Sequence, residues 1–335
     1  MTIVISVQAL EDLVAAVFVR HGLAPASART VAAAVAAAER DGSRSHGLFR
    51  LPGYVATLKS GWIDGNAQPV VSDAAPGLVK VDAANGFAQV ALAVGAPLLR
   101  EKARRQGIAA LAIHQSHHFA ALWPDIEPFA VDGFVAMAFV NARSRVAPWG
   151  ARRKFLGTNP MAFACPRNGA LPLVWDQASS VMAQGEVLLA AKEGHALPDG
   201  IGLDSQGNAT CDPKAILEGG AMLPFGGHKG SAIAFMVEIM AAAVTGGRFG
   251  YQDRSADFPG AQTSNAGETI ILIDPVRSAG DSVGDRLVGL FEGLAAAGVS
   301  RLPADARYAR RRKSIAEGIA VPQETYDMVQ GYLKE

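Results

Sequence analysis

The sequence has little of three features that mark common protein classes: cysteine, net charge and long apolar runs. Its 335 residues include two cysteines, Cys165 and Cys211, which form neither a disulfide framework nor a zinc pattern and fit a reducing compartment. The 31 Lys and Arg balance 31 Asp and Glu, and zero net charge argues against general binding to nucleic acid or an anionic membrane. The longest apolar stretch, Ser231–Val244, is interrupted by Glu238 and falls short of the roughly 18 residues of a membrane-spanning helix.

The N-terminal residues MTIVISVQAL contain no basic segment and no cleavage site, so we expect no signal peptide and a cytoplasmic location. Half of the residues are apolar and 19% are charged, which excludes a disordered chain. A chain of this length forms two domains or one large one with an ample core, and at this size it is most often an enzyme.

Glycine is abundant, with 36 residues, but the common glycine-rich nucleotide-binding motifs are missing. Gly200-Ile-Gly202 lacks the third glycine of the dinucleotide-binding fingerprint, and Gly226-Gly-His-Lys-Gly230 does not have the P-loop spacing. The serine-hydrolase elbow, H-E-x-x-H and paired C-x-x-C are absent as well. The sequence therefore excludes the commonest nucleotide-binding loops.

The expected helices and strands are mixed and do not alternate as in a parallel doubly wound sheet. Periodicity and capping residues predict helices over residues 7–21 (capped by Ser6), 27–41 (capped by Ser27), 51–61, 91–106, 180–191, 229–245 and 283–297. Strands are expected over 78–81, 108–113, 134–140 and 269–273, with a hairpin of 162–165 and 171–175. The helix over 229–245 is apolar on nearly all sides and is predicted to be buried, whereas 194–213 is predicted to be an extended connection.

The first segment with reactive residues is Ser45-His46-Gly47, with Arg50 four residues after His46. If this segment enters a helix, Arg50 lies about one turn from His46 on the same face. A histidine that exchanges protons near neutral pH, beside an arginine that binds a carboxylate with two N–H groups, suits chemistry at the carbon next to a carboxylate. The alternative is a solvated loop histidine and a surface arginine.

The second segment, His114–Phe119, contains three histidines in five residues. It follows a strand directly, and no neighbouring carboxylate or cysteine completes a metal site. We therefore predict no metal and favour a helix N-terminus whose free N–H groups face an anion.

The third segment, Gly226–Gly230, places His228 and Lys229 at the start of a helix, where the dipole repels cations. An anionic ligand such as phosphate would offset this repulsion, and the alternative is a glycine-rich turn with two solvated cations. The run Arg307–Lys313 contains five basic residues in seven and is either a solvated helix face or a phosphate contact.

These segments, taken together and in order, resemble the malate/L-lactate dehydrogenase family of the non-Rossmann kind, over nearly the whole chain. The matching segments are Ser45-His46-Gly47-x-x-Arg50-Leu-Pro, Ser116-x-His118-Phe119, Gly157-Thr-Asn-Pro160, Asp176-x-Ala-Ser-Ser180, Asp212-Pro213, Leu223-Pro-x-Gly-Gly-His-Lys-Gly230 and Arg301-Leu-Pro303. The resemblance implies a mixed α/β fold with a mainly antiparallel central sheet, a nicotinamide cofactor bound without a Rossmann motif, and a homodimer.

The resemblance also implies roles for particular residues. His46 would donate or accept the proton, oriented by Ser45, while Arg50 and Thr158 would bind the substrate. The cofactor would lie against His118, Phe119, Ala120, Asp176, Gln177, Ala178, His228, Lys229, Arg301 and Arg307. The expected domains are a helical one built from both chain ends, residues 1–110 with 285–335, and a cofactor-binding one, residues 111–284.

One departure from the family pattern indicates a branch. Lactate- and malate-like members have Ala-x-Gly-Lys where this chain has Ala183-Gln-Gly-Glu186. A lysine polarises a ketone oxygen, whereas a carboxylate favours a cationic iminium or a protonated His46. Glu186 thus resembles the acid of the Δ1-piperideine-2-carboxylate/Δ1-pyrroline-2-carboxylate reductases, in a relay with Ser45 and His46, although Asp is the expected acid there.

The sequence therefore predicts a reductase of small cyclic imino acids that uses NADPH, with NADH possible. The preference for NADPH rests on the basic residues of Arg307–Lys313 and on His228 and Lys229, which could meet a 2′-phosphate. A second hypothesis is an NAD-dependent 2-hydroxy-acid dehydrogenase acting on malate, lactate or ureidoglycolate. A third is a catalytically silent homologue that keeps the cofactor site.

Overall fold

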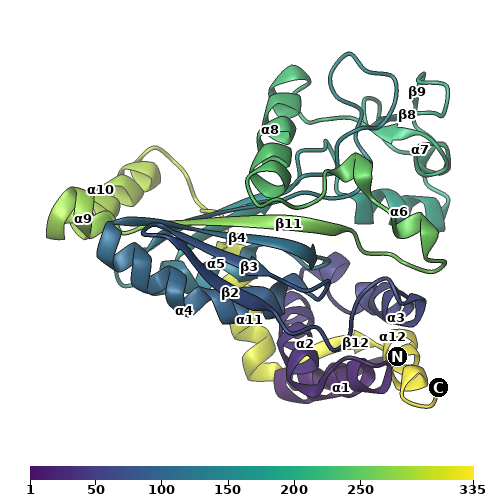
Figure 1. Ribbon diagram of the computed structural model, residues 1–335, viewed down its shortest axis with the longest axis horizontal. Coiled ribbons are helices and arrows are strands. Elements are labelled where there is room, and N and C mark those ends of the chain that lie inside the picture. Colours follow the sequence, from purple (N-terminus) through teal and green to yellow (C-terminus); the bar gives the residue numbers. More distant parts are fainter.

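Seven strands form the central sheet of the protein, for which a computed structural model describes residues 1–335 (Figure 1). In spatial order the strands are β2 (Val70–Ala75), β3 (Leu78–Asp82), β4 (Ile108–His117), β11 (Asn265–Ile273), β5 (Val135–Val140), β6 (Met161–Cys165) and β7 (Leu173–Gln177). Only β3 and β4 run parallel, and every other neighbouring pair is antiparallel. The predicted mixed fold with a mainly antiparallel sheet is confirmed, and so is the predicted hairpin, which is β6–β7.

One face of this sheet carries the largest apolar core, of 26 buried residues. Helices α4 (Ala88–Gln106) and α5 (Trp123–Val131) pack against it, and alternate residues of β11, including Ile270 and Leu272, point into it. Glu268 lies two residues before Ile270 and follows the same alternation, so a carboxyl group faces the α5 side of the sheet.

The two chain ends pack together. Strand β1 (Thr2–Ile5) pairs antiparallel with β12 (Ile319–Pro322), and the ends of the chain lie close together in Figure 1. Around this pair, helices α1 (Val7–Arg20), α2 (Pro25–Arg40), α3 (Leu51–Ser60) and α12 (Gln323–Tyr332) enclose a second core of 20 residues, and α11 (Asp305–Glu317) packs against α2 and β12.

The structure confirms one of the two predicted helix caps and contradicts the other. The Oγ of Ser6 accepts a hydrogen bond from the N–H of Ala9 at 3.1 Å, as predicted for the cap of α1. The cap predicted at Ser27 is wrong, because Pro25 begins α2 and Ser27 is buried inside it. The basic run Arg307–Lys313 lies within α11.

The other face of the sheet carries a smaller unit with a core of eight residues. It consists of α6 (Gln184–Glu193), β8 (Gly202–Leu203), β9 (Ala209–Thr210), α7 (Pro213–Leu217), β10 (Ala221–Met222) and α8 (His228–Glu238), with a π-turn at Ile239–Ala243. The predicted extended connection thus contains two short strands. The prediction that the α8 segment is buried all round is wrong, because Phe235, Met236 and Ile239 are exposed along one side.

Beyond β11 the chain forms α9 (Pro275–Ala279) and α10 (Val283–Ala296), which project from the end of the sheet in Figure 1. Helix α10 buries none of its side chains within this chain. The division into two domains stays a prediction. The central sheet draws β2 and β3 from residues 1–110, the segment assigned to the helical domain in that prediction. No helix is both long and apolar enough to cross a membrane.

Candidate active site

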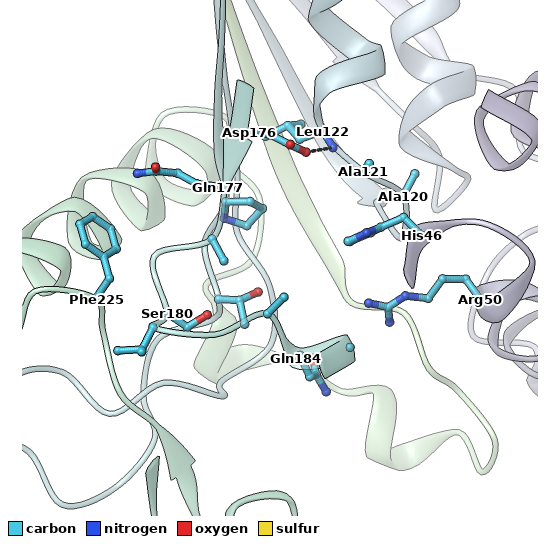
Figure 2. Close-up of a pocket in the computed structure, with 16 residues that line it drawn as sticks. His46, Arg50, Ala120, Ala121, Leu122, Asp176, Gln177, Ser180, Gln184 and Phe225 are labelled. Atoms are coloured by element: carbon cyan, nitrogen blue, oxygen red, sulfur yellow. Dashed lines mark hydrogen bonds between the residues drawn. The ribbon is translucent and has the colours of Figure 1, made fainter. Parts of the chain in front are cut away.

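Two joined cavities lie where the 44–50 segment faces β7 and the start of α6 (Figure 2). The first cavity, of ≈ 470 Å³, extends toward β7 and Phe225, and the second, of ≈ 270 Å³, extends toward the loop after β5. Six residues line both: His46, Arg50, Ala120, Thr158, Pro160 and Gln184. The residues at this junction therefore face any ligand that spans the two cavities.

Two short 3₁₀ turns, Arg44–His46 and Leu48–Arg50, hold the His46 side of the cavity. Gly47 lies between the two turns, at a position with no room for a side chain. A Cβ there would lie 2.3 Å from the Oε1 of Glu39, which accepts a hydrogen bond from the N–H of Leu48 at 2.7 Å. The backbone at this point is thus held against α2.

His46, Ser45 and Arg50 are connected by hydrogen bonds. The Oγ of Ser45 lies 3.1 Å from the Nδ1 of His46, and the Nε of Arg50 donates to the carbonyl oxygen of Ser45 at 2.9 Å. The Arg50 guanidinium lies 4.6 Å from the centre of the Phe119 ring. In Figure 2, His46 and Arg50 extend side by side from one wall toward the opposite one.

The electrostatics of this wall keep His46 neutral. Burial, followed by the charges of Arg50 and His118, lowers the pKa of His46 to about 4. At neutral pH the imidazole therefore carries one ring proton. An anion bound at Arg50 would oppose the effect of the guanidinium and favour protonation of His46.

The pKa of His118 is shifted in the opposite direction. Its Nε2 lies 2.7 Å from the Oδ2 of Asp125, in the first turn of α5. Burial lowers the pKa of His118, but the hydrogen bond and charge of Asp125, together with the charges of Glu268 and Asp176, outweigh burial and raise it overall. Glu268 of β11 lies in the same cluster, fully buried, and neither of its carboxyl oxygens has a hydrogen-bond partner. Burial, followed by the charge of Asp125, raises the pKa of Glu268 to about 8.

Asp176, at the end of β7, is oriented toward the N-terminus of α5. Its Oδ2 accepts the backbone N–H groups of Leu122 at 3.0 Å and Trp123 at 3.3 Å. Asp176 thus satisfies two N–H groups at the start of α5, and the Oγ of Ser179 donates to the carbonyl of Asn159 at 2.7 Å.

Residues 5–330 match the family model described as malate/L-lactate dehydrogenase. The chain belongs to this family and is an oxidoreductase. It is 53% identical over 315 residues to a Δ1-pyrroline-2-carboxylate/Δ1-piperideine-2-carboxylate reductase from Pseudomonas putida, covering 94% of this chain and 92% of that protein. A reductase of the same name from Pseudomonas syringae pv. tomato is 51% identical over 326 residues, covering 97% and 95%.

A solved structure supports the same relationship. The crystal structure of Δ1-piperideine-2-carboxylate reductase from Pseudomonas syringae pv. tomato superimposes with a TM-score of 0.97 at 50% identity, covering 99% of this chain and all of that one. The family resemblance inferred from the sequence is thereby confirmed.

Within this family fold, most of the predicted substrate- and cofactor-contacting residues come together. Asp176, Gln177 and Ala178 line the first cavity, His118 and Phe119 line the second, and Thr158 lines both. Gly157, next to Thr158, has no room for a side chain, because a Cβ would lie 2.3 Å from the carbonyl oxygen of Ala142. This close contact between backbones places Thr158 at the junction.

Glu186 is not brought to His46. It is exposed in the first turn of α6 and lines neither cavity. The two residues before it face the site instead: Gln184 lines both cavities, and a Cβ at Gly185 would lie 3.3 Å from the Cβ of Ser45. The predicted relay of Ser45, His46 and Glu186 is therefore not formed in this arrangement.

The remaining predicted cofactor contacts lie outside the two cavities. His228 and Lys229 are exposed at the N-terminus of α8, and Arg301 is exposed before α11. Arg307 is partly buried, with its guanidinium 4.3 Å from the centre of the Trp123 ring and its Nη2 3.3 Å from the carbonyl of Val174. Its Nη1 is buried without a hydrogen-bond partner.

Sequence reasoning also missed residues. It found no carboxylate for the histidine segment, yet Asp125 and Glu268 both reach His118 from elsewhere in the chain. Glu268 could have been noticed in the sequence as a lone acidic residue in an otherwise largely apolar strand. His117 next to it is structural, because its ring nitrogens lie 2.8 Å from the Oγ1 of Thr263 and 3.0 Å from the Oδ1 of Asn85.

Proposed function

We propose that the protein reduces cyclic imino acids, Δ1-piperideine-2-carboxylate to L-pipecolate and Δ1-pyrroline-2-carboxylate to L-proline. The observation that carries this proposal is the position of Arg50 and His46, side by side where the two cavities join. A carboxylate and a group that takes up a proton can be held together there. The names of the relatives support the choice of substrate class.

A nicotinamide cofactor supplies the hydride, and the residues of the first cavity fit such a group. The chain offers Asp176, Gln177 and Ala178 as cavity walls, and the unpartnered Nη1 of Arg307 is a buried donor beside them that an anionic ligand would satisfy. We propose NADPH as the preferred form, with NADH possible, because Lys229, next to His228, and Arg307 are cations without a carboxylate partner within salt-bridge distance.

The chain's own residues bind and orient the substrate. Arg50, with Thr158, binds the carboxylate and thereby fixes the adjacent imine carbon at the junction of the cavities. The hydride adds to this carbon, and the ring nitrogen takes up one proton, so that the C=N bond becomes a secondary amine.

His46 manages this proton. Its low pKa makes the protonated imidazole a good acid toward the more basic ring nitrogen, and Ser45 fixes the orientation of the ring through Nδ1. The bound substrate carboxylate beside Arg50 favours the protonated form of His46 before the transfer.

A second candidate is a dehydrogenase of 2-hydroxy acids such as malate, lactate or ureidoglycolate. The exposed position of Glu186 favours it, because no carboxylate on α6 lies against His46 to select a cationic iminium over a ketone. Arg50 and His46 would serve this reaction in the same roles.

Parallel assays distinguish the candidates. Oxidation of NADPH and of NADH is followed at the same protein concentration with Δ1-piperideine-2-carboxylate, Δ1-pyrroline-2-carboxylate, pyruvate and oxaloacetate. We expect kcat/KM to be highest for an imino acid with NADPH. Higher kcat/KM with a keto acid would establish the second candidate, and turnover of none would favour a silent homologue.

We also propose a homodimer in which the exposed apolar side of α8 is covered. Phe235, Met236 and Ile239 form this side, and large apolar surfaces of this kind commonly mark subunit contacts. Light scattering should give twice the mass of one chain, and Phe235→Glu should reduce it to one.

A further inference from the structure

The second cavity is lined by three arginines and by no carboxylate. Arg50 lies at the junction, while Arg143 and Arg145 come from the loop after β5 at the other end. Arg50 alone suffices for the single carboxylate of the proposed substrate. Arg143 and Arg145 therefore require a separate explanation.

The backbone of the loop is held firmly at both arginines. The N–H of Arg143 donates to the Oγ of Ser264 at 3.0 Å, and the N–H of Arg145 donates to the carbonyl of Leu156 at 2.7 Å. In turn, the carbonyl of Arg145 accepts the N–H of Met222 at 2.8 Å. The two guanidinium groups thus extend from a fixed backbone, which suits a binding site better than a mobile surface.

The charges of the pair are not balanced by the protein. Neither arginine forms a salt bridge, and the Nε of Arg145 is buried without a hydrogen-bond partner. Arg143 donates to the Oγ of Ser255 at 3.1 Å, and Ser255 in turn donates to Asp253, the one acid whose charge acts on both arginines. Lys154 adds a further positive charge nearby.

Partly buried cations that form no salt bridge are unfavourable. Burial, and then the charge of Arg143, lowers the pKa of Arg145 to about 10. An anionic group in the second cavity would relieve both the repulsion between the arginines and the unsatisfied Nε. The residues proposed as cofactor-binding walls, Asp176, Gln177 and Ala178, line the first cavity and do not line the second, where the two arginines lie.

We propose that Arg143 and Arg145 form a second anion-binding subsite, which accepts cyclic imino acids carrying an additional carboxylate on the ring. The proposal rests on the proposed function, since it assumes that Arg50 binds the carboxylate next to the imine. The second carboxylate extends from the junction toward the loop after β5, and the ring lies between the two anion sites.

Planar rings that cannot be reduced test this inference without turnover. Isothermal titration calorimetry of the full chain measures the dissociation constants of pyridine-2-carboxylate and of the 2,4-, 2,5- and 2,6-dicarboxylates. We expect one dicarboxylate to bind at least about tenfold more tightly than the monocarboxylate. Arg145→Gln should remove this gain and leave the affinity for the monocarboxylate within about threefold, whereas Arg145→Lys should keep part of the gain.

Arg153→Gln is the matched control, because Arg153 lies on the same loop, is exposed and lines neither cavity. Thermal unfolding confirms that each variant is folded, and Arg143→Gln replaces Arg145→Gln if that variant is not. The proposal is overturned if no dicarboxylate binds more tightly than the monocarboxylate. It is also overturned if Arg145→Gln weakens both classes equally, since Arg145 would then bind the shared carboxylate.

Failure of the proposed function gives a different result. Tight, Arg145-dependent binding of a dicarboxylate together with no reduction of any cyclic imino acid would overturn the proposed reaction and leave the subsite in place.

Discussion

His46 and His118 line the same cavity, but the surroundings of the two imidazoles differ. Ser45 and the guanidinium of Arg50 lie beside His46, and burial and positive charge lower the pKa of His46 to about 4. His118 instead contacts Asp125, whose hydrogen bond and charge raise the pKa of His118 despite burial. Groups whose pKa values are moved apart in one site are suited to different protonic roles.

Burial lowers the pKa of both imidazoles, so the difference between them comes from their charged neighbours. Both rings are almost completely removed from water, yet one is neutral and the other is held toward its cationic form. His46 can therefore pass a proton on, whereas His118 is held toward its cationic form, whose charge lowers the pKa of His46. Each of the following predictions alters one side of this comparison.

The largest effect is expected from the neutral histidine. His46→Ala should lower kcat for the imino acid by about 10²–10⁴-fold, the usual contribution of a positioned acid or base. Cofactor affinity, measured by fluorescence titration, should stay nearly unchanged. His195→Ala is the control because His195 is exposed, away from both cavities. Unimpaired turnover by His46→Ala would show that another group handles the proton.

Arg50 is expected to give the next effect. Arg50→Gln removes the charged hydrogen bonds to the substrate carboxylate, so kcat/KM should fall by about tenfold to a hundredfold, or roughly 1.5–3 kcal/mol. The charge of Arg50 also lowers the pKa of His46, so the limb of the pH profile on which activity falls as His46 loses its proton should move to higher pH in this variant. An unchanged limb would mean that burial alone sets the pKa of His46.

On the other side of the cavity, Asp125→Asn should reverse the shift at His118. With the Asp125 carboxylate gone, only the charges of Glu268 and Asp176 oppose burial, so the pKa of His118 should fall. Histidine Cε1–H signals followed by NMR through a pH titration measure this directly. Asp82→Asn, which acts on His114 instead, is the control. A His118 signal that titrates unchanged in Asp125→Asn contradicts the account.

The smallest effect concerns stability. The folded protein keeps a proton on Glu268 up to a pKa of about 8, while the unfolded chain loses it at the ordinary value near 4.5. The free energy of unfolding should therefore fall as pH rises between these two values. Glu268→Gln should remove this part of the slope and be the more stable form at about pH 8.

Urea unfolding at about pH 5 and about pH 8 measures the effect of Glu268→Gln. Glu292→Gln, an exposed change on α10, should leave the slope unaltered. Equal slopes for the wild type and Glu268→Gln would show that Glu268 is ionised in the folded protein.

The His46 side of the site could be predicted from the sequence because its members are close in the chain. Ser45, His46 and Arg50 lie within six residues, and their local turns bring them together. The antiparallel hairpin β6–β7 was predictable for the same reason, because a five-residue connection that contains Asn168-Gly169 joins its predicted strands.

The His118 side could not be predicted in this way. Asp125 reaches His118 through the entry of α5, and Glu268 reaches it through the pairing of β11 with β4, between residues 150 positions apart. The side on which a strand residue points depends on register, which a bulge between Ala266 and Glu268 alters here. For Glu186 the local pattern suggested the site, but the helical turn presents Gln184 and Gly185 to it instead.

The central claim is that a hydride is delivered to the carbon held beside Arg50. The most direct test supplies NADPH carrying deuterium at the transferable C4 position, with Δ1-piperideine-2-carboxylate as the substrate, and examines the product by NMR. The account predicts L-pipecolate with one deuterium at C2, the carbon bearing the carboxylate. Unlabelled product, or deuterium at any other carbon, would contradict it.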